Sequence, residues 1–195
     1  MLKRVTQAKF VVWVVALSFV FLGGCAKPPT KEIESADKAV AEAKQKEADL
    51  YAQDVFAKAE ETLQQAHAHV AQKKYKEAKA AAEEAVKIAE QAVSMVEPNK
   101  AKMKADAEQM LTDVQNALGE LKSSVAAAIK KKAPINREEI QGMIGKWEID
   151  LVNIKDQMQA EKIRQAYDLL VSLQEQVTSQ KENMAAAMEP KAAKQ

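Results

Sequence analysis

The residue best suited to covalent chemistry is Cys25, the only cysteine among 195 residues. A thiolate is the nucleophile that alkylation requires. Cys25 follows Leu22, Gly23 and Gly24, and these residues end an apolar run of thirteen residues that begins at Phe10. Gly23 and Gly24 have no side chains that would hinder access to the chain beside the thiol.

The segment before Cys25 has the form of an export signal. Lys3, Arg4 and Lys9 precede the apolar run. A helix needs about 20 apolar residues to cross the hydrocarbon core of a bilayer. The run is too short for this, and it is typical of the apolar region of a signal peptide. We expect residues 1–24 to be a signal peptide that is removed.

Leu22-Gly23-Gly24-Cys25 resembles the lipobox of bacterial lipoprotein precursors. The resemblance implies that a signal peptidase recognises Leu22, Gly23 and Gly24, and that Cys25 receives diacylglycerol and then an acyl chain such as palmitate on its freed amine. Two or more acyl chains hold a protein firmly on a membrane. Ala26 stands where aspartate signals inner-membrane retention in enterobacterial sorting. The resemblance thus favours the outer membrane and a position facing the periplasm, with the inner membrane left open.

Other residues that could bind a metal ion, bind phosphate or act as paired acids do not have the spacing or the setting that such a site requires. His67 and His69 diverge by about 200° on a helix, so they do not chelate one metal ion, and we expect both at the surface. Gly142-x2-Gly145 has the outline of a phosphate loop but lies within a helical pattern, which favours helix packing instead. The adjacent acids Glu83-Glu84 fall on an exposed face.

Four methionines of the C-terminal half could form a ligand groove, but core packing is the commoner role of such residues. These are Met143, Met158, Met184 and Met188. The sequence contains no Ser-His-Asp, Cys-His or zinc-site spacing. We therefore predict a protein that is not an enzyme, with no cofactor, no metal and no small-molecule substrate.

Composition predicts the fold class and excludes one kind of partner. Removal of residues 1–24 takes away Lys3, Arg4 and Lys9 and no acid, so the formal net charge of +1 becomes −2. This balance argues against nucleic acid as a partner. The remaining chain is rich in Ala, Glu, Lys, Gln and Leu, which favour helix. We predict an all-α, elongated bundle of about six helices joined in antiparallel hairpins.

The first predicted module covers residues 31–97 and follows a lipidated tether at 25–30. Its helices are expected at about 31–46, 54–70 and 75–97, with a loop at 48–53 and Asp54 as an N-cap. Apolar side chains recur every three or four residues, and in the third helix they widen into an arc that indicates two neighbouring helices. The expected core positions are Ile33, Ala36, Val40, Ala43, Phe56, Ala59, Leu63, Ala66, Val70, Tyr75, Ala78, Ala82, Ala85, Ala89, Ala92 and Val96.

Residues 35–92 resemble a family of alanine-rich bacterial envelope lipoproteins, the domain of unknown function numbered forty-three ninety-eight. The matching features are the spacing of Ala36, Ala39 and Ala43, the loop with Tyr51, the ladder Ala59-x3-Leu63-x2-Ala66, and Tyr75-x2-Ala78. The family carries Gly-Asp in the turn where this chain has Lys73-Lys74. The resemblance implies a helical hairpin like a tetratricopeptide unit and no established activity.

The second predicted module covers residues 98–188, because Pro98-Asn99 is expected to end the preceding helix. A helix of about 30 residues should then run to Lys130-Lys131-Lys132, with core positions at Ala107, Leu111, Val114, Leu118, Leu121, Val125 and Ala128. Three lysines from Lys100 to Lys104 would oppose the dipole of a helix start. A continuous, kinked helix is therefore an alternative. The three lysines at the helix end are either a solvated terminus or a surface-binding patch.

Asn136 and Glu139 have the spacing of a capping box, and Ile135 and Ile140 that of a hydrophobic staple. They predict a helix start. Its core stripe is Ile140, Met143, Trp147, Leu151, Ile154 and Met158. The period breaks at 159–161, which predicts a second hairpin turn, with one kinked helix as the alternative. The last stripe is Ile163, Ala166, Leu170, Leu173 and Val177, and the helix is expected to fray at 185–187 into a disordered tail at 189–195.

These features favour a structural or scaffolding lipoprotein of the bacterial envelope that contacts a protein partner. One alternative is a carrier that holds an apolar ligand between the third and sixth helices, and another is a cell-wall tether. Trp147 lies on an apolar stripe and is expected in the core; an exposed indole there would instead be a candidate partner surface.

Overall fold

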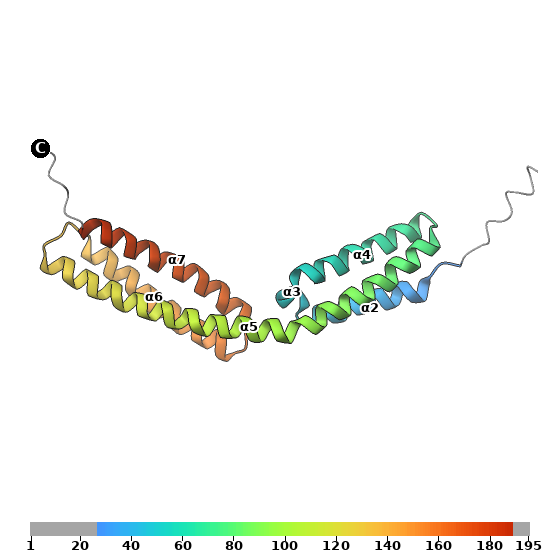
Figure 1. Cartoon of the computed structure of the whole chain (residues 1–195), viewed down its shortest axis with the longest axis horizontal. Coiled ribbons are helices and arrows are strands. Elements are labelled where there is room, and N and C mark those ends of the chain that lie inside the picture. The colour runs from blue at the N-terminus through green and yellow to red at the C-terminus, as the bar shows by residue number, and fades with distance from the viewer. Residues whose placement is uncertain (1–26, 189–195) are drawn as a thin grey trace, which may run out of the picture. The chain divides into compact units, whose positions relative to one another are not determined.

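A computed structural model describes residues 27–188 of the chain, and within this range every regular element is a helix. The prediction of an all-α fold with about six helices is confirmed. The helices are α2 (Thr30–Gln45), α3 (Ala48–Tyr51), α4 (Gln53–Ala71), α5 (Tyr75–Lys130), α6 (Arg137–Gln159) and α7 (Ile163–Met188). Figure 1 shows α2 and α4 beside the first part of α5, and α6 and α7 beside its last part.

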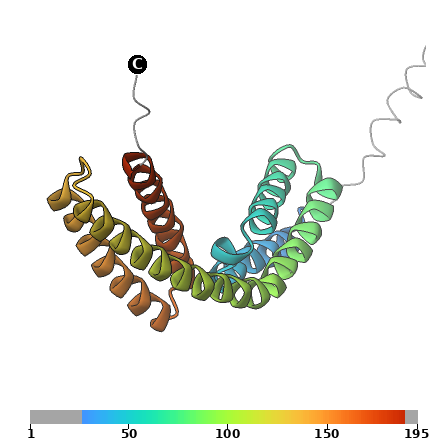
Figure 2. The same ribbon diagram turned by 60° about the vertical axis from the view of Figure 1, so that its left-hand side comes forward.

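The chain divides into two compact units, and the division differs from the expected boundary at residue 98. Unit 1 contains residues 27–43 and Asp54–Glu90, while unit 2 contains Lys44–Gln53 and residues 91–188. The ten residues Lys44–Gln53 thus belong to unit 2, although the segments before and after them in sequence belong to unit 1. The view in Figure 2 again shows α2 and α4 beside the first part of α5, and α6 and α7 beside its last part.

The core of unit 1 is built on small side chains. Ala36 of α2, Ala66 of α4, and Ala82 and Ala85 of α5 are fully buried against one another. Helices approach closely when the contact positions are alanine. Because α5 contacts both α2 and α4 in this cluster, the prediction that this helix has two neighbours is confirmed.

The turns of the bundle share one local structure, which is visible in the backbone hydrogen bonds. At the end of α4, the N–H of Lys74 donates to the carbonyl of His69, and Lys73 has a φ of 58°. The same arrangement recurs at Lys132 after α5 and at Glu161 after α6. A residue in the left-handed region closes a helix by this pattern, most often glycine. Here charged side chains occupy it.

Helix α5 runs without interruption through Pro98, so the prediction that Pro98-Asn99 ends a helix is wrong. Proline in a helix interior lacks an N–H donor and its ring crowds the preceding turn. Pro98 is exposed, so the ring faces solvent and the carbonyl that loses its partner is accessible to water. The alternative of a continuous helix was right, and it removes the dipole conflict because Lys100 to Lys104 lie inside α5.

The segment 48–53, expected to be a loop, forms the short helix α3 and packs on α5 directly after Pro98. Asn99 donates from Nδ2 to the carbonyl of Tyr51 at 2.7 Å. The Nζ of Lys100 lies 3.0 Å from Oε2 of Glu47 and 5.4 Å from the centre of the Tyr51 ring. The carboxylate of Glu47 raises the pKa of Lys100. With Tyr51 itself buried, these contacts support α5 where the proline weakens it.

Unit 2 has larger side chains in its core than unit 1. Val114, Leu118 and Leu121 of α5 meet the apolar faces of α6 and α7 in one cluster. All predicted core positions of α7 are buried. In α6 the prediction is wrong at one place, because Ile144 is buried and Met143 only partly so. The two residues are neighbours in sequence, and the direction of approach of α5 and α7 decides between them.

The predicted start of α6 and the predicted turn between α6 and α7 are confirmed. The side chain of Asn136 accepts a hydrogen bond from the N–H of Glu139, as an N-cap requires. The chain turns at 160–162, so the hairpin is confirmed and the single kinked helix is wrong. Helix α7 continues to Met188, which corrects the expected fraying at 185–187. The predicted tail at 189–195 lies outside the described residues.

Replacement of Pro98 by alanine should stabilise the protein. Pro98→Ala restores an N–H donor to the interior of α5 and should raise the free energy of unfolding by up to about 3 kcal/mol. Urea denaturation measures it. Pro134→Ala is the matched control, because Pro134 lies between α5 and α6 and its replacement should not stabilise. Equal effects of the two changes would contradict a continuous α5.

Candidate interaction surface

The predicted lipid-attachment residue Cys25 and the peptidase-recognition residues Leu22, Gly23 and Gly24 lie outside the described residues. The structure does show where the folded part begins. The carbonyl of Pro29 accepts a hydrogen bond from the N–H of Ile33 at 3.0 Å, and Pro29 is buried. Pro29 therefore packs in unit 1, although the prediction places it in the tether at 25–30.

Trp147 is buried in unit 2, as the apolar stripe predicted. Its side chain is 4% exposed, and its indole N–H donates to Oε1 of Gln176 on α7 at 3.1 Å. Buried indoles commonly find such a partner. The alternative of Trp147 as a partner surface required an exposed indole, which this structure does not provide.

The most exposed large apolar side chains in the described part of the chain lie on the other side of α6. Ile149 is 71% exposed and Val152 is 60% exposed. At about 100° per residue, they lie opposite the buried stripe that contains Trp147. With Gly142 and Gly145 they form a line at spacings of three, four and three residues, which we call the α6 strip.

The two glycines of the α6 strip have free space above them. A Cβ atom built on Gly142 or Gly145 meets no other atom within 4 Å. The expectation that these glycines serve helix packing inside the protein is therefore wrong. No phosphate loop is formed either, because both residues lie within α6. Glycine in a helix interior costs about 0.5–1 kcal/mol relative to alanine, and no contact within unit 2 offsets this cost.

Charged and polar groups border the α6 strip on both sides. On the side of α5, Glu148 forms an ion pair with Lys122. On the side of α7, a hollow of about 130 Å³ lies between the two helices. Its lining residues are Lys146, Asp150, Asn153, Ile154, Leu169, Ser172, Leu173 and Gln176. Leu169 is 41% exposed and adds apolar surface to this rim.

The two histidines lie apart from this surface, in unit 1. His67 lies 2.8 Å from Asp37 of α2 through Nε2 and Oδ1, and its side chain is half exposed, as expected. His69 departs from the surface prediction, because Nδ1 is buried and has no hydrogen-bond partner. No group of three or more metal-ligating residues occurs within residues 27–188. Glu83 and Glu84 are exposed.

Sequence reasoning missed Ile149 and Val152, although a signal was present. The line Gly142, Gly145, Ile149 and Val152 has the heptad spacing of a helix contact. This line competes with the stripe through Trp147 on the same helix. The stripe through Trp147 contains more apolar residues, so its spacing predicts the core, and the prediction gives no role to Ile149 and Val152.

Neither membrane spans nor known relatives add to this description. Among the described helices, none has the length and apolar character needed to cross a membrane. Comparison of the chain with protein families, with curated proteins and with solved structures gives no match.

The burial of Trp147 has a measurable consequence, since removal of residues 1–24 leaves it as the only tryptophan. Protein that starts at residue 25 should show blue-shifted emission that resists quenching by acrylamide. Trp147→Ala should lower the free energy of unfolding by about 3–5 kcal/mol. Ile149→Ala, on the opposite side of α6, is the control and should change it by less than about 0.5 kcal/mol. Red, easily quenched emission would contradict the core position.

Proposed function

We propose that the protein is a non-enzymatic lipoprotein of the bacterial envelope, held on a membrane through Cys25, that binds a helical segment of a protein partner. The observation that carries the anchor is the sequence Leu22-Gly23-Gly24-Cys25 after a thirteen-residue apolar run. Pro29, which is buried in unit 1, is only four positions after Cys25, so an anchor there would hold unit 1 close to the membrane. The outer membrane is the proposed location, because Ala26 and not aspartate follows the cysteine.

The α6 strip supports the protein-binding part of the proposal. A helix docks on another helix through apolar residues at heptad spacing, and glycine allows the two backbones to approach closely. Gly142 and Gly145 leave that space free, and Ile149 and Val152 supply apolar area next to it. The strip extends over about 15 Å of α6. Its length suits two to three turns of a partner helix.

The anchor is tested by Cys25→Ser. This variant lacks the thiol, so it should take up no fatty acid in metabolic labelling, whereas the parent chain becomes labelled. The variant should accumulate as an uncleaved precursor, or as a soluble product if another peptidase cuts it. Label on the serine variant would contradict attachment at Cys25. Density-gradient fractionation of the labelled parent tests the outer-membrane assignment.

The α6 strip is tested by the double variant Ile149→Ser and Val152→Ser. Chemical crosslinking in intact cells should give the parent chain a recurrent product with a partner protein, and the double variant should lose most of it. Both side chains are largely exposed, so the free energy of unfolding should change by less than about 0.5 kcal/mol per site.

Ile129→Ser is the matched control, because Ile129 is 39% exposed and lies on α5 outside the α6 strip. It should leave the crosslinked product unchanged. An undiminished product from the double variant would contradict the role of the strip. A product of twice the chain's mass from purified protein would assign the strip to self-association instead of a partner. The carrier and cell-wall alternatives stay predictions.

A further inference from the structure

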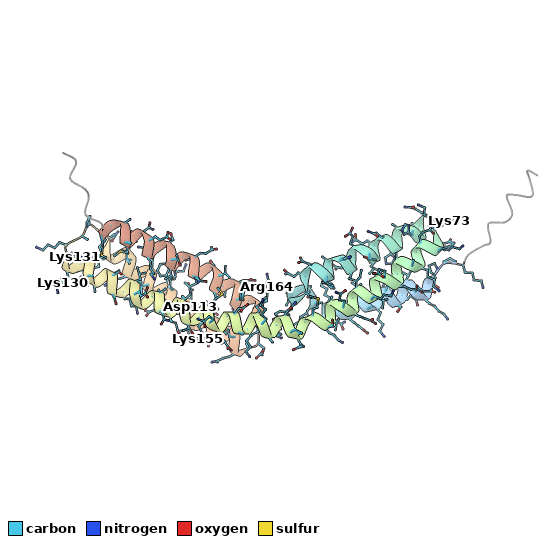
Figure 3. The ribbon with its side chains drawn as sticks, in the orientation of Figure 1. Lys73, Asp113, Lys130, Lys131, Lys155 and Arg164 are labelled. Atoms are coloured by element: carbon cyan, nitrogen blue, oxygen red, sulfur yellow. The ribbon has the colours of Figure 1, made fainter. Side chains whose placement is uncertain are left out.

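One end of unit 1 combines the starts of two helices with a turn. The Nζ of Lys79 in α5 lies 2.9 Å from Oε1 of Glu32 in α2, so the first turns of these helices are side by side. The turn at 72–74 leads directly into α5 and lies at this same end. Figure 3 shows Lys73 on this turn, near the start of α2.

Exposed lysines gather at this end, which we call the basic end. They are Lys27, Lys31, Lys73, Lys74 and Lys76. None of the five joins an ion pair within the described part of the chain. They come from two segments of the sequence, 27–31 and 73–76, that the fold brings together.

Acids at the basic end do not cancel this charge. Glu32, Glu34 and Glu77 are the acidic residues among 27–34 and 72–79. Glu32 is already engaged, because a hydrogen bond from Lys79 lowers the pKa of its carboxyl group and raises the pKa of Lys79. Six lysines therefore face three acids, and the five exposed lysines remain available to an external anion.

The opposite end of unit 1 carries charges of both signs. Its exposed acids are Glu42, Asp54, Glu84 and Glu90, its exposed lysines are Lys58 and Lys87, and a further exposed lysine, Lys44, lies in the last turn of α2. A planar anionic surface would therefore attract the basic end more strongly than the opposite end.

The chain length places the basic end close to the lipidated residue. Pro29 is four positions after Cys25, which limits the distance between them to about 14 Å. Lys27 lies within about 7 Å of Cys25 on the same grounds. Charges act over about 8–10 Å at physiological ionic strength. An anchor at Cys25 therefore holds the basic end within electrostatic reach of lipid headgroups.

We propose that the basic end binds the anionic phospholipid headgroups of the membrane that holds the protein, as a second attachment beside the acyl chains. This inference rests on the proposed anchor at Cys25. A lysine near an anionic bilayer strengthens binding by about fivefold, and lysine ammonium groups bind phosphate as point charges without a shaped pocket. The contact orients unit 1 with its α4–α5 turn toward the membrane.

The test uses the chain from residue 25 with Cys25→Ser, which carries no acyl chain. It should sediment with vesicles of phosphatidylcholine and phosphatidylglycerol in a two-to-one ratio, and not with phosphatidylcholine alone. High salt should abolish this binding. Replacement of the five lysines of the basic end by glutamine should weaken it at least tenfold.

A matched control changes five exposed lysines of unit 2 to glutamine, at Lys46, Lys102, Lys146, Lys155 and Lys162. Figure 3 labels one of them, Lys155, on α6. Net charge falls equally in both variants, so a difference between them reports on position. Binding of the control should stay within about threefold of the parent. Equal losses in the two variants, or equal binding to both kinds of vesicle, would overturn the proposal.

Orientation gives a second readout. Cys25→Ser leaves no other cysteine, so Gln72→Cys and Ala57→Cys each carry a fluorophore at one site. The two positions lie about 22 Å apart along α4. Energy transfer to labelled lipid should be strong from residue 72 and weak from residue 57, and the reverse order would overturn the proposal. Because no acyl chain is present, these results are independent of fatty-acid labelling at Cys25.

Discussion

The structure depends on the continuity of α5 through Pro98. Helix α5, which has 56 residues, contributes to the core of each unit. Its first part packs against α2 and α4, and its last part packs against α6 and α7. A proline in its interior would normally end it, at a cost of about 3 kcal/mol. The docking of α3 beside Pro98, through Asn99 and Lys100, provides contacts that offset this cost.

The two units are stabilised by different kinds of packing. In unit 1, fully buried alanines such as Ala36 and Ala82 let helices approach closely, and each buries little apolar area. Ion pairs between helices, such as Lys79 with Glu32, border this core. Unit 2 buries Leu121, Leu170 and Trp147, whose larger side chains contribute more per residue.

The proposed functional surfaces use side chains that the fold does not need. Ile149 and Val152 face away from the core of unit 2, and Lys73 and Lys74 occupy a turn in which glycine is the commoner residue. Lys73 adopts the left-handed backbone region, which is unfavourable for a side chain. Helices hold both surfaces rigidly, since each belongs to a packed helix or to a turn closed by backbone hydrogen bonds.

The sequence by itself determined the features that arise from local interactions. Asn136 caps α6, breaks in the apolar period mark the turns, and the stripe on α7 is buried as its spacing predicts. The stripe on α5 is buried except at Tyr75 and Leu111, which are partly buried. These signals act over three or four residues, so they need no knowledge of distant segments. The resemblance of Leu22-Gly23-Gly24-Cys25 to a lipobox is equally local, and these residues lie outside the described part of the chain. Tertiary structure decided the continuity at Pro98, because the stabilising contacts come from residues 47–51, about fifty positions earlier. Tertiary structure also decided that Ile144 is buried and Met143 only partly so, and it left Gly142 and Gly145 in open space. The reason is that the direction from which α5 and α7 approach selects which of two apolar stripes on α6 is buried.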